Sequence, residues 1–85
     1  MGHYLYILES KAARRFYVGA TENPGRRLTF HNGAERGFTA RYRPWELVFV
    51  QQFNTKHDAL MAERRVKSWK SRRMIERLLA RQIHL

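Results

Sequence analysis

The chain opens with two short apolar runs, YLYIL at residues 4–8 and FYVG at residues 16–19, separated by mostly polar residues. Tyrosine, isoleucine and valine suit a half-buried pleated surface, so these runs predict strands over His3–Glu9 and Arg15–Thr21. The connection Ser10–Arg14 between them indicates a hairpin. We therefore expect the first 21 residues to begin a sheet.

A short helix is predicted after the hairpin, because both of its ends carry the usual signals. Asn23 fits the N-cap, and Pro24 fits the first helical position, where an amide hydrogen is not needed. Gly33 fits the residue that closes a helix, which we therefore expect over Pro24–Asn32. The next segment, Gly33–Pro44, is typical of a basic loop.

The second half of the chain predicts one strand and two helices. Trp45–Phe53 contains the run Leu47–Val50, which is apolar on both faces and typical of a strand covered on both sides. The pattern T-x-x-D resembles a capping box at the start of a helix over Thr55–Trp69. A last helix is expected from Ser71 to about Arg81. The order β-β-α-β-α-α indicates a small α+β domain with a mainly antiparallel sheet.

The net charge of the chain indicates which kind of molecule it binds. Lysine and arginine number 17 against 7 acids, which gives a net charge of +10, and 13 of the 17 are arginine. Arginine forks match phosphate oxygens in pairs, so an excess of this size on a small folded domain favours nucleic acid as the partner. A ribosomal-type or membrane-surface charge is the alternative.

The remaining totals exclude several classes of protein. The 85 residues leave room for one domain, 1–85, and 44% hydrophobic residues suffice for a core. Without cysteine there is no disulfide partner, thiolate metal site or thiol nucleophile, which suits a cytoplasmic location. No apolar run reaches the roughly 20 residues of a membrane span. The N-terminus also lacks the pattern of a signal peptide.

Glu63 is out of place on its predicted helix. It lies on or beside the core stripe formed by Ala59, Ala62 and Val66. A carboxylate in such a position needs a cation, hydrogen-bond donors or a metal. One explanation is an i,i+4 ion pair with Lys67. The other is a divalent cation, because Mg²⁺ is typically held by one or two carboxylates plus waters and substrate phosphates.

The first predicted helix carries a second polar group of interest. Arg27 and His31 are four residues apart and share a face, so they can offer a guanidinium and an imidazole to one phosphate. A solvated basic face is the alternative. Arg26 is expected to contact phosphate generally or to lie on plain surface.

The tyrosines of the two strands have two interpretations. Tyr4 and Tyr6 point to one face of their strand, and Tyr17 lies on the partner strand. Tyrosine in a strand usually packs, but it can act as a general base or orient a water if nearby cations lower its pKa from about 10. Gly19, inside an otherwise good strand, indicates a bulge, the close approach of another backbone, or a strand end.

The basic loop is a further candidate surface. Its arginines interleave with aromatic residues, and cations beside aromatics can bind phosphates and stack on bases. The alternative is that Tyr42 and Trp45 pack against the sheet while the arginines are solvated. The arginines are Arg36, Arg41 and Arg43, and the aromatics are Phe38, Tyr42 and Trp45.

Together these pieces resemble the GIY-YIG endonuclease superfamily, over nearly the whole chain. Tyr4-Leu5-Tyr6 takes the place of the first motif, although Tyr4 stands where glycine is usual, and Tyr17-Val18-Gly19 takes that of the second. Arg27, His31 and Glu63 then match the helix arginine, the histidine one turn on and the metal-binding glutamate. The segments FTARY at residues 38–42 and KSWK at residues 67–70 resemble the small single-domain bacterial branch.

This resemblance implies a central three-stranded antiparallel sheet flanked by helices. It also implies hydrolysis of phosphodiester bonds with one divalent metal, Mg²⁺ or Mn²⁺, leaving 5′-phosphate and 3′-hydroxyl ends, in DNA repair or processing. The implied catalytic residues are Tyr6, Tyr17, Arg27, His31 and Glu63, with Glu63 as the metal ligand. The residues expected to bind nucleic acid are Arg26, Arg36, Thr39, Arg41, Arg43, Lys67 and Lys70, and those with a structural role are Tyr4 and Gly19.

The rival hypothesis is a basic module that binds nucleic acid without cutting it, since affinity for phosphates needs only cations. DNA is the expected partner, and RNA, branched and single-stranded substrates are left open. A module that docks an acidic protein has no specific residue in its favour.

Overall fold

The structure is a computed structural model that describes residues 2–33 and 37–85. Three antiparallel strands lie in the order β2-β1-β3, so β1 is central. The strands are β1 (His3–Ser10), β2 (Arg15–Thr21) and β3 (Glu46–Phe53), and the helices are α1 (Pro24–Asn32), the 3₁₀ helix η1 (Phe38–Tyr42), α2 (Lys56–Ser68) and α3 (Arg72–Leu79). Among the described residues, no helix combines the length and apolar character needed to cross a membrane.

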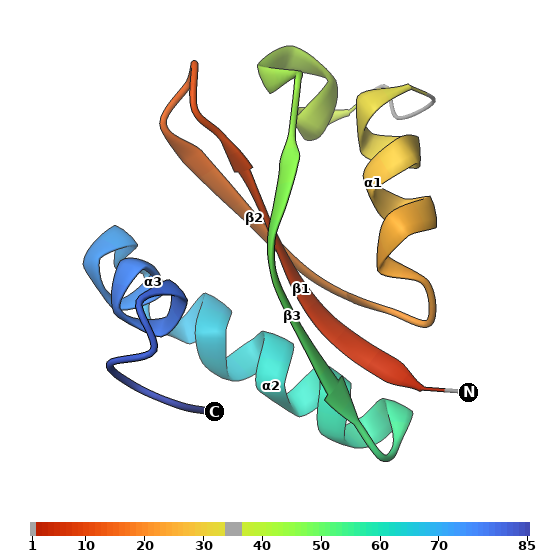
Figure 1. Cartoon of the computed structure of the whole chain (residues 1–85), viewed down its shortest axis with the longest axis vertical. Helices are drawn as coiled ribbons and strands as arrows, with labels where there is room; N and C mark the ends of the chain where they lie inside the picture. The colour runs from red at the N-terminus through yellow and green to blue at the C-terminus, as the bar shows by residue number, and fades with distance from the viewer. Residues whose placement is uncertain (1, 34–36) are drawn as a thin grey trace.

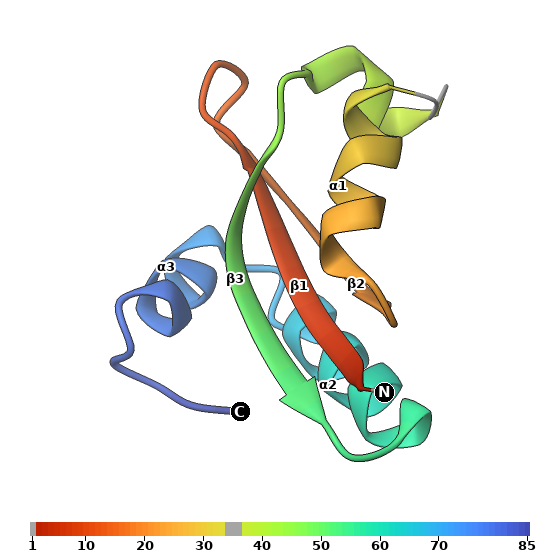
Figure 2. The same ribbon diagram turned by 45° about the vertical axis from the view of Figure 1, so that its right-hand side comes forward.

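Different helices cover the two faces of the sheet (Figures 1 and 2). The α1 face buries Tyr6, Leu8 and Trp45. The opposite face buries a second cluster against α2 and α3, made by Leu5, Ile7, Val18, Ala62, Val66 and Leu78. The two clusters follow from the alternation of side chains along β1, where successive residues point to opposite faces.

The helix starts confirm the capping residues read from the sequence. The side chain of Asn23 accepts a hydrogen bond from the amide of Arg26 at 3.0 Å. Thr55 and Ser71 accept in the same way from amides three residues on, at 3.1 and 3.2 Å. The element order and the antiparallel sheet are likewise as predicted.

The structure corrects four details. The segment expected to be a loop contains η1. Gly33 closes α1 at φ −124°, so it does not use the left-handed conformation usual for a closing glycine. Helix α3 ends at Leu79, because Arg81 has φ 60° and cannot continue a right-handed helix. Val50 is 43% exposed, so β3 is not covered on both sides along its whole length.

Candidate active site

Tyr6 lies on the central strand with its ring on the α1 face of the sheet, and it is 1% exposed. His31, in the last turn of α1, is 2% exposed. The Tyr6 hydroxyl oxygen and the His31 Nε2 are 3.1 Å apart and share a hydrogen bond. A hydroxyl and an imidazole at this distance can pass a proton between them.

Tyr17 joins this pair from the neighbouring strand. It stands opposite Leu8 in the β1–β2 ladder, which places its side chain on the same face as Tyr6. The ring of Tyr17 lies 4.6 Å from that of His31 and 6.3 Å from that of Tyr6, measured between centroids. The three rings therefore form one cluster between α1 and the sheet.

Arg27 completes the cluster from α1, one turn before His31. Its guanidinium interacts with the Tyr6 hydroxyl, and this interaction is the largest cause of the raised pKa of Arg27. Tyr17 adds a weaker effect in the same direction. Arg27 and His31 thus share a face, as expected, but His31 is buried in the cluster and does not belong to a solvated basic surface.

The pKa of Tyr6 is raised and not lowered, so the condition set for a general-base role of its phenolate is not met. Burial of the phenol raises it above the ordinary value of 10.0, because a phenolate is poorly solvated there. The hydrogen bond from Arg27 opposes this effect, and the charges of Tyr17 and Glu63 add to it. The cations of the domain therefore do not make Tyr6 a standing phenolate at neutral pH.

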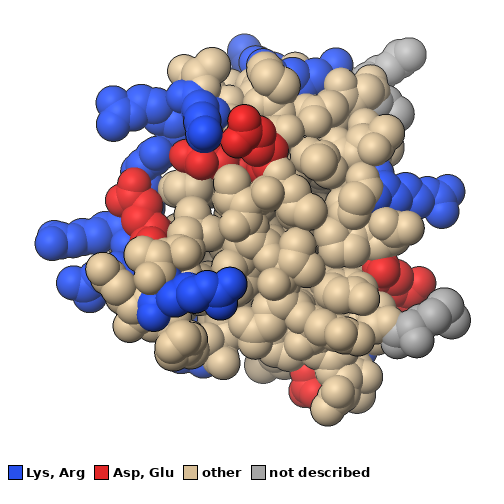
Figure 3. Space-filling model, in the orientation of Figure 1, with Lys and Arg blue, Asp and Glu red and all other residues tan. Residues whose placement is uncertain are grey.

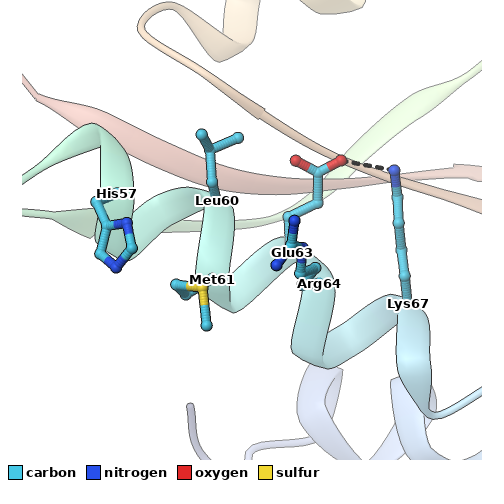
Figure 4. A pocket seen from close by; sticks show the side chains of 6 residues that line it. All are labelled: His57, Leu60, Met61, Glu63, Arg64 and Lys67. Carbon is cyan, nitrogen blue, oxygen red and sulfur yellow. Dashed lines mark hydrogen bonds and ion pairs between the residues drawn. The ribbon is translucent and has the colours of Figure 1, made fainter.

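Glu63 lies on α2, which packs on the opposite face of the sheet. Its side chain is 20% exposed, and its Oε2 accepts a hydrogen bond from the Lys67 Nζ at 2.6 Å. Figure 4 shows this ion pair on the side of α2 from which Leu60 also projects. The i,i+4 pair weighed from the sequence is therefore present. These residues line a hollow of about 340 Å³.

Lys67 connects Glu63 with the ring cluster. A second hollow, of about 370 Å³, lies between β2, α2 and the start of α3, and Tyr17, Lys67 and Lys70 line it. The strand β2 lies at the edge of the sheet. The Glu63 carboxylate adds a minor effect to the raised pKa of Tyr6, after burial and Tyr17.

Gly19 explains how the ring of Tyr6 fits against β2. The two residues stand opposite each other in the ladder, and a Cβ added at Gly19 would lie 2.6 Å from the Tyr6 hydroxyl oxygen. The close approach is therefore made by a side chain and not by another backbone. A strand end is excluded as well, because β2 continues to Thr21.

The sequence matches the GIY-YIG catalytic domain over residues 2–76. The chain belongs to the GIY-YIG family. A solved relative, the UPF0213 protein BH0048 from Bacillus halodurans, superposes with a TM-score of 0.60 at 35% identity, covering 94% of this chain and 84% of its own. The antiparallel three-stranded fold is therefore that of the small single-domain members.

Two kinds of curated protein are among the relatives of this GIY-YIG chain. A UPF0213 protein from Natronomonas pharaonis is 40% identical over 79 residues, which cover 92% of this chain and 91% of the relative. The fungal protein named structure-specific endonuclease subunit slx1, from Pyrenophora tritici-repentis, is 40% identical over 78 residues, which cover 85% of this chain. The match spans only 21% of the length of that fungal relative.

The donors in the described part of this GIY-YIG domain fit one kind of metal site. No group of three or more His, Cys, Asp or Glu side chains lies together in the described part of the chain. Glu63 offers one partly exposed carboxylate beside the hollows. This donor set fits a hard cation held by one carboxylate, with water and phosphate oxygens supplying the other positions. It does not fit a cage made of protein ligands.

The other predicted residues of the GIY-YIG domain separate into several groups. Arg26, Arg41 and Lys70 are exposed. Arg43 donates to the backbone oxygens of His31 and Gly33, at 3.0 and 3.2 Å, so it tethers the end of α1. Tyr4 is half-buried on the same strand face as Tyr6. Arg36 lies outside the described residues, as does the side chain of Thr39.

Two aromatic residues of the segment expected to be a basic loop, Tyr42 and Trp45, pack against the sheet, and the side chain of Phe38 lies outside the described residues. Trp45 is buried, and Tyr42 packs against the same cluster with the guanidinium of Arg15 4.6 Å from its ring centroid. This outcome supports the packing alternative for both side chains. Figure 3 shows that lysine and arginine side chains stand mainly around the margin of the face drawn, and that its centre carries few charges.

Two residues that the sequence did not single out belong to the site region. Asn32 makes two hydrogen bonds to the backbone of Trp45 and so fixes the end of α1 against the start of β3. Phe30 places its ring beside Arg27, with the guanidinium carbon 4.8 Å from the centroid. In the sequence, these two residues can be found only as an asparagine at the end of a predicted helix and an aromatic residue three positions after Arg27.

Proposed function

We propose that this GIY-YIG domain is a divalent-metal-dependent endonuclease that hydrolyses phosphodiester bonds of DNA, in repair or processing, and leaves 5′-phosphate and 3′-hydroxyl ends. The observation that carries the proposal is the hydrogen bond between Tyr6 and His31, 3.1 Å long and buried beside the Arg27 guanidinium. A proton acceptor next to a fixed cation suits the attack of water on a phosphate.

Tyr6 and His31 would move the proton of the attacking water. Because burial raises the pKa of Tyr6, its hydroxyl is protonated when substrate binds. As the water oxygen bonds to phosphorus, the Tyr6 oxygen takes the water proton and passes its own to His31 Nε2. The bond from phosphorus to the 3′-oxygen breaks, and that oxygen takes up a proton from solvent. This relay requires Nε2 to be unprotonated at the start.

Arg27 and Tyr17 would hold the phosphate. The guanidinium is already oriented by Tyr6, and its two-pronged donor set matches phosphate oxygens. Negative charge that builds on the phosphate during attack is stabilised by a cation that does not need to reorganise. Tyr17, whose ring packs 4.6 Å from that of His31, would position the phosphate or the water through its hydroxyl.

Glu63 would hold the divalent cation together with water and phosphate oxygens. When bound, the cation supplies Lewis-acid stabilisation of the charge on the phosphate and on the leaving oxygen. Lys67 would release the carboxylate and turn to a phosphate, because it also lines the hollow beside Tyr17. Lys70, Arg26 and Arg41 would add contacts to neighbouring phosphates.

A direct assay tests the proposal. Labelled single-stranded and double-stranded DNA and RNA are incubated with the purified protein in Mg²⁺, Mn²⁺ or EDTA. We expect cleavage of DNA in the presence of metal and none in EDTA. Glu63→Gln and Tyr6→Phe should each abolish it. Glu76→Gln is the matched control, because Glu76 forms an i,i+4 pair with Arg72 on α3.

The outcomes separate the two hypotheses. Metal-dependent cleavage that is lost in Glu63→Gln and kept in Glu76→Gln supports the nuclease. Nucleic acid that is retarded but stays intact under every metal condition identifies a binding module with the same fold. Cleavage that Glu63→Gln and Tyr6→Phe leave unchanged contradicts the assignment of the site.

A further inference from the structure

Phe30 is an exposed aromatic residue at the border of the candidate site. It lies on α1 and is 37% exposed. The guanidinium carbon of Arg27 lies 4.8 Å from its ring centroid. The ring of His31 meets it edge-on, with centroids 5.6 Å apart. Phe30 therefore borders the site beside Arg27 and His31.

Core packing leaves part of this ring exposed. Leu28 is the α1 residue that packs against the cluster of Tyr6, Leu8 and Trp45, whereas 37% of Phe30 stays exposed. Four large apolar side chains are exposed in the described part of the chain, and Phe30 is the aromatic one. The other three, Val50, Leu60 and Met61, lie on β3 and α2.

We propose that Phe30 is a nucleobase-stacking residue that binds the base next to the phosphate held by Arg27. The inference rests on the proposed function in one respect, namely that a phosphate binds at Arg27. Phosphate and base of one nucleotide are joined through a single sugar. A phosphate on the guanidinium therefore leaves a base within reach of a ring 4.8 Å away.

Stacking makes Phe30 a determinant of which substrates bind well. A base stacks on an aromatic ring through its π face, so the contact tolerates any sequence. In an intact duplex that face is covered by neighbouring bases, and exposing it costs a few kcal/mol. A base that is already unpaired, in a single strand, at a frayed end or at a junction, avoids this cost. Phe30 should therefore favour substrates with an unpaired nucleotide at the site.

Binding measured in EDTA tests the proposal without requiring cleavage. Fluorescence anisotropy compares three probes of equal length at one salt concentration: a single strand, a full duplex, and a strand of sugar-phosphate units without bases. We expect Phe30→Ala to weaken single-strand binding by about 5- to 150-fold, the range for loss of one stacked base. Its binding to the duplex and to the baseless strand should change less than about twofold.

Two further variants make the comparison specific. Phe30→Trp should keep or strengthen single-strand binding, because the larger ring stacks better. Val50→Ala removes an apolar side chain of similar exposure from β3, outside the hollow at Glu63, and should leave all three probes unaffected. Circular dichroism checks that each variant is folded.

Each outcome decides whether Phe30 stacks on a base or only positions the Arg27 guanidinium. If Phe30→Ala weakens all three probes equally, Phe30 only positions the guanidinium and the proposal is wrong. No change with any probe also overturns it. A selective loss on the single strand supports it, even if no metal condition gives cleavage, in which case the proposed nuclease activity fails alone. Cleavage by the parent protein with no selective loss leaves the nuclease standing and rejects stacking.

Discussion

The ring of Tyr6 lies directly over Gly19 on the neighbouring strand, at a distance that leaves no room for a side chain. A Cβ at position 19 would lie 2.6, 2.7 and 2.8 Å from three atoms of the Tyr6 ring and hydroxyl. The two residues are paired in the β1–β2 ladder, so neither can move without disturbing the sheet. The glycine is therefore a requirement of where the Tyr6 hydroxyl sits.

Gly19→Ala should displace the Tyr6 ring and break its hydrogen bond to His31. Overpacking of this kind costs about 1–3 kcal/mol of unfolding free energy. If Tyr6 relays a proton, DNA cleavage should fall by about tenfold or more, even at temperatures where the variant is folded. Denaturant unfolding and initial cleavage rates measure the two effects.

Gly25→Ala is the control for this substitution. Gly25 lies on α1 close to Arg26 and Arg27, and an added Cβ meets its nearest atom at 3.7 Å, which is ordinary contact. Alanine favours a helix over glycine by up to about 1 kcal/mol, so this variant should be as stable as the parent or more stable. Equal stability and activity in the two variants would contradict the steric argument.

In the folded protein, Tyr6 should lose its proton at an unusually high pH. Its contribution to stability should therefore fall at high pH. Its pKa is raised above 10.0 in the folded protein, so the unfolded chain loses that proton first. The contribution of Tyr6 to stability is therefore complete below about pH 10 and is lost as pH rises through the higher folded pKa. Tyr6→Phe should lose less unfolding free energy than the parent between about pH 8 and about pH 11.

Absorbance of the phenolate provides a second measurement of the same shift. Titration of the folded protein should show a last ionisation step that Tyr6→Phe removes. Tyr4→Phe is the control, since it removes a phenol from the same face of the same strand and should leave the last step in place. If Tyr6→Phe instead removes an early ionisation step, burial does not dominate the pKa of Tyr6.

Lys67→Met should strengthen metal binding at Glu63. The ammonium pairs with Oε2 at 2.6 Å, so a divalent cation bound at Glu63, as proposed, competes with it for the carboxylate. Partly exposed ion pairs contribute up to about 1 kcal/mol, which corresponds to a two- to fivefold gain in Mn²⁺ affinity. Calorimetric titration with Mn²⁺ measures this gain, and Glu63→Gln should show no binding at this site.

Lys11→Met controls for the loss of one positive charge. Lys11 lies in the exposed turn between β1 and β2 and pairs with Glu46 of β3 at 3.5 Å. Neither residue is on the helix that carries Glu63. Any general effect of net charge on cation affinity should appear equally in both lysine variants. If Lys67→Met binds Mn²⁺ no more tightly than Lys11→Met, the ammonium does not compete for the carboxylate.

Much of the fold could be predicted because its signals are local. Asn23, Thr55 and Ser71 cap their helices through amides three residues away, a contact that any short sequence window contains. The apolar runs of β1 and β2 specify strands in the same way. The end of α3 was wrong by about two residues, since the backbone turn at Arg81 has no sequence signal as strong as glycine.

The site was less predictable, because its properties depend on tertiary contacts. The resemblance named Tyr6 and Glu63, but the direction of the Tyr6 pKa depends on burial between α1 and the sheet, which outweighs a net charge of +10 spread over the surface. Sequence alone suggested that Trp45 could stack on bases, but its side chain is buried against the sheet and cannot do so. The exposure of Phe30 depends likewise on how α1 docks. The catalytic roles stay predictions.

Asn32 makes the contact that should matter most for the placement of α1. Its Oδ1 accepts from the Trp45 amide at 2.7 Å, and its Nδ2 donates to the Trp45 carbonyl at 3.0 Å. Asn32→Ala leaves both partly buried backbone groups without these partners, at a cost of about 1–3 kcal/mol of unfolding free energy. Because His31 precedes Asn32, cleavage should fall as well.

Asn54→Ala, in an exposed turn, is the control and should unfold like the parent. Denaturant unfolding followed by tryptophan fluorescence measures both, and equal midpoints for the two variants would show that the Asn32–Trp45 pair does not hold α1 in place.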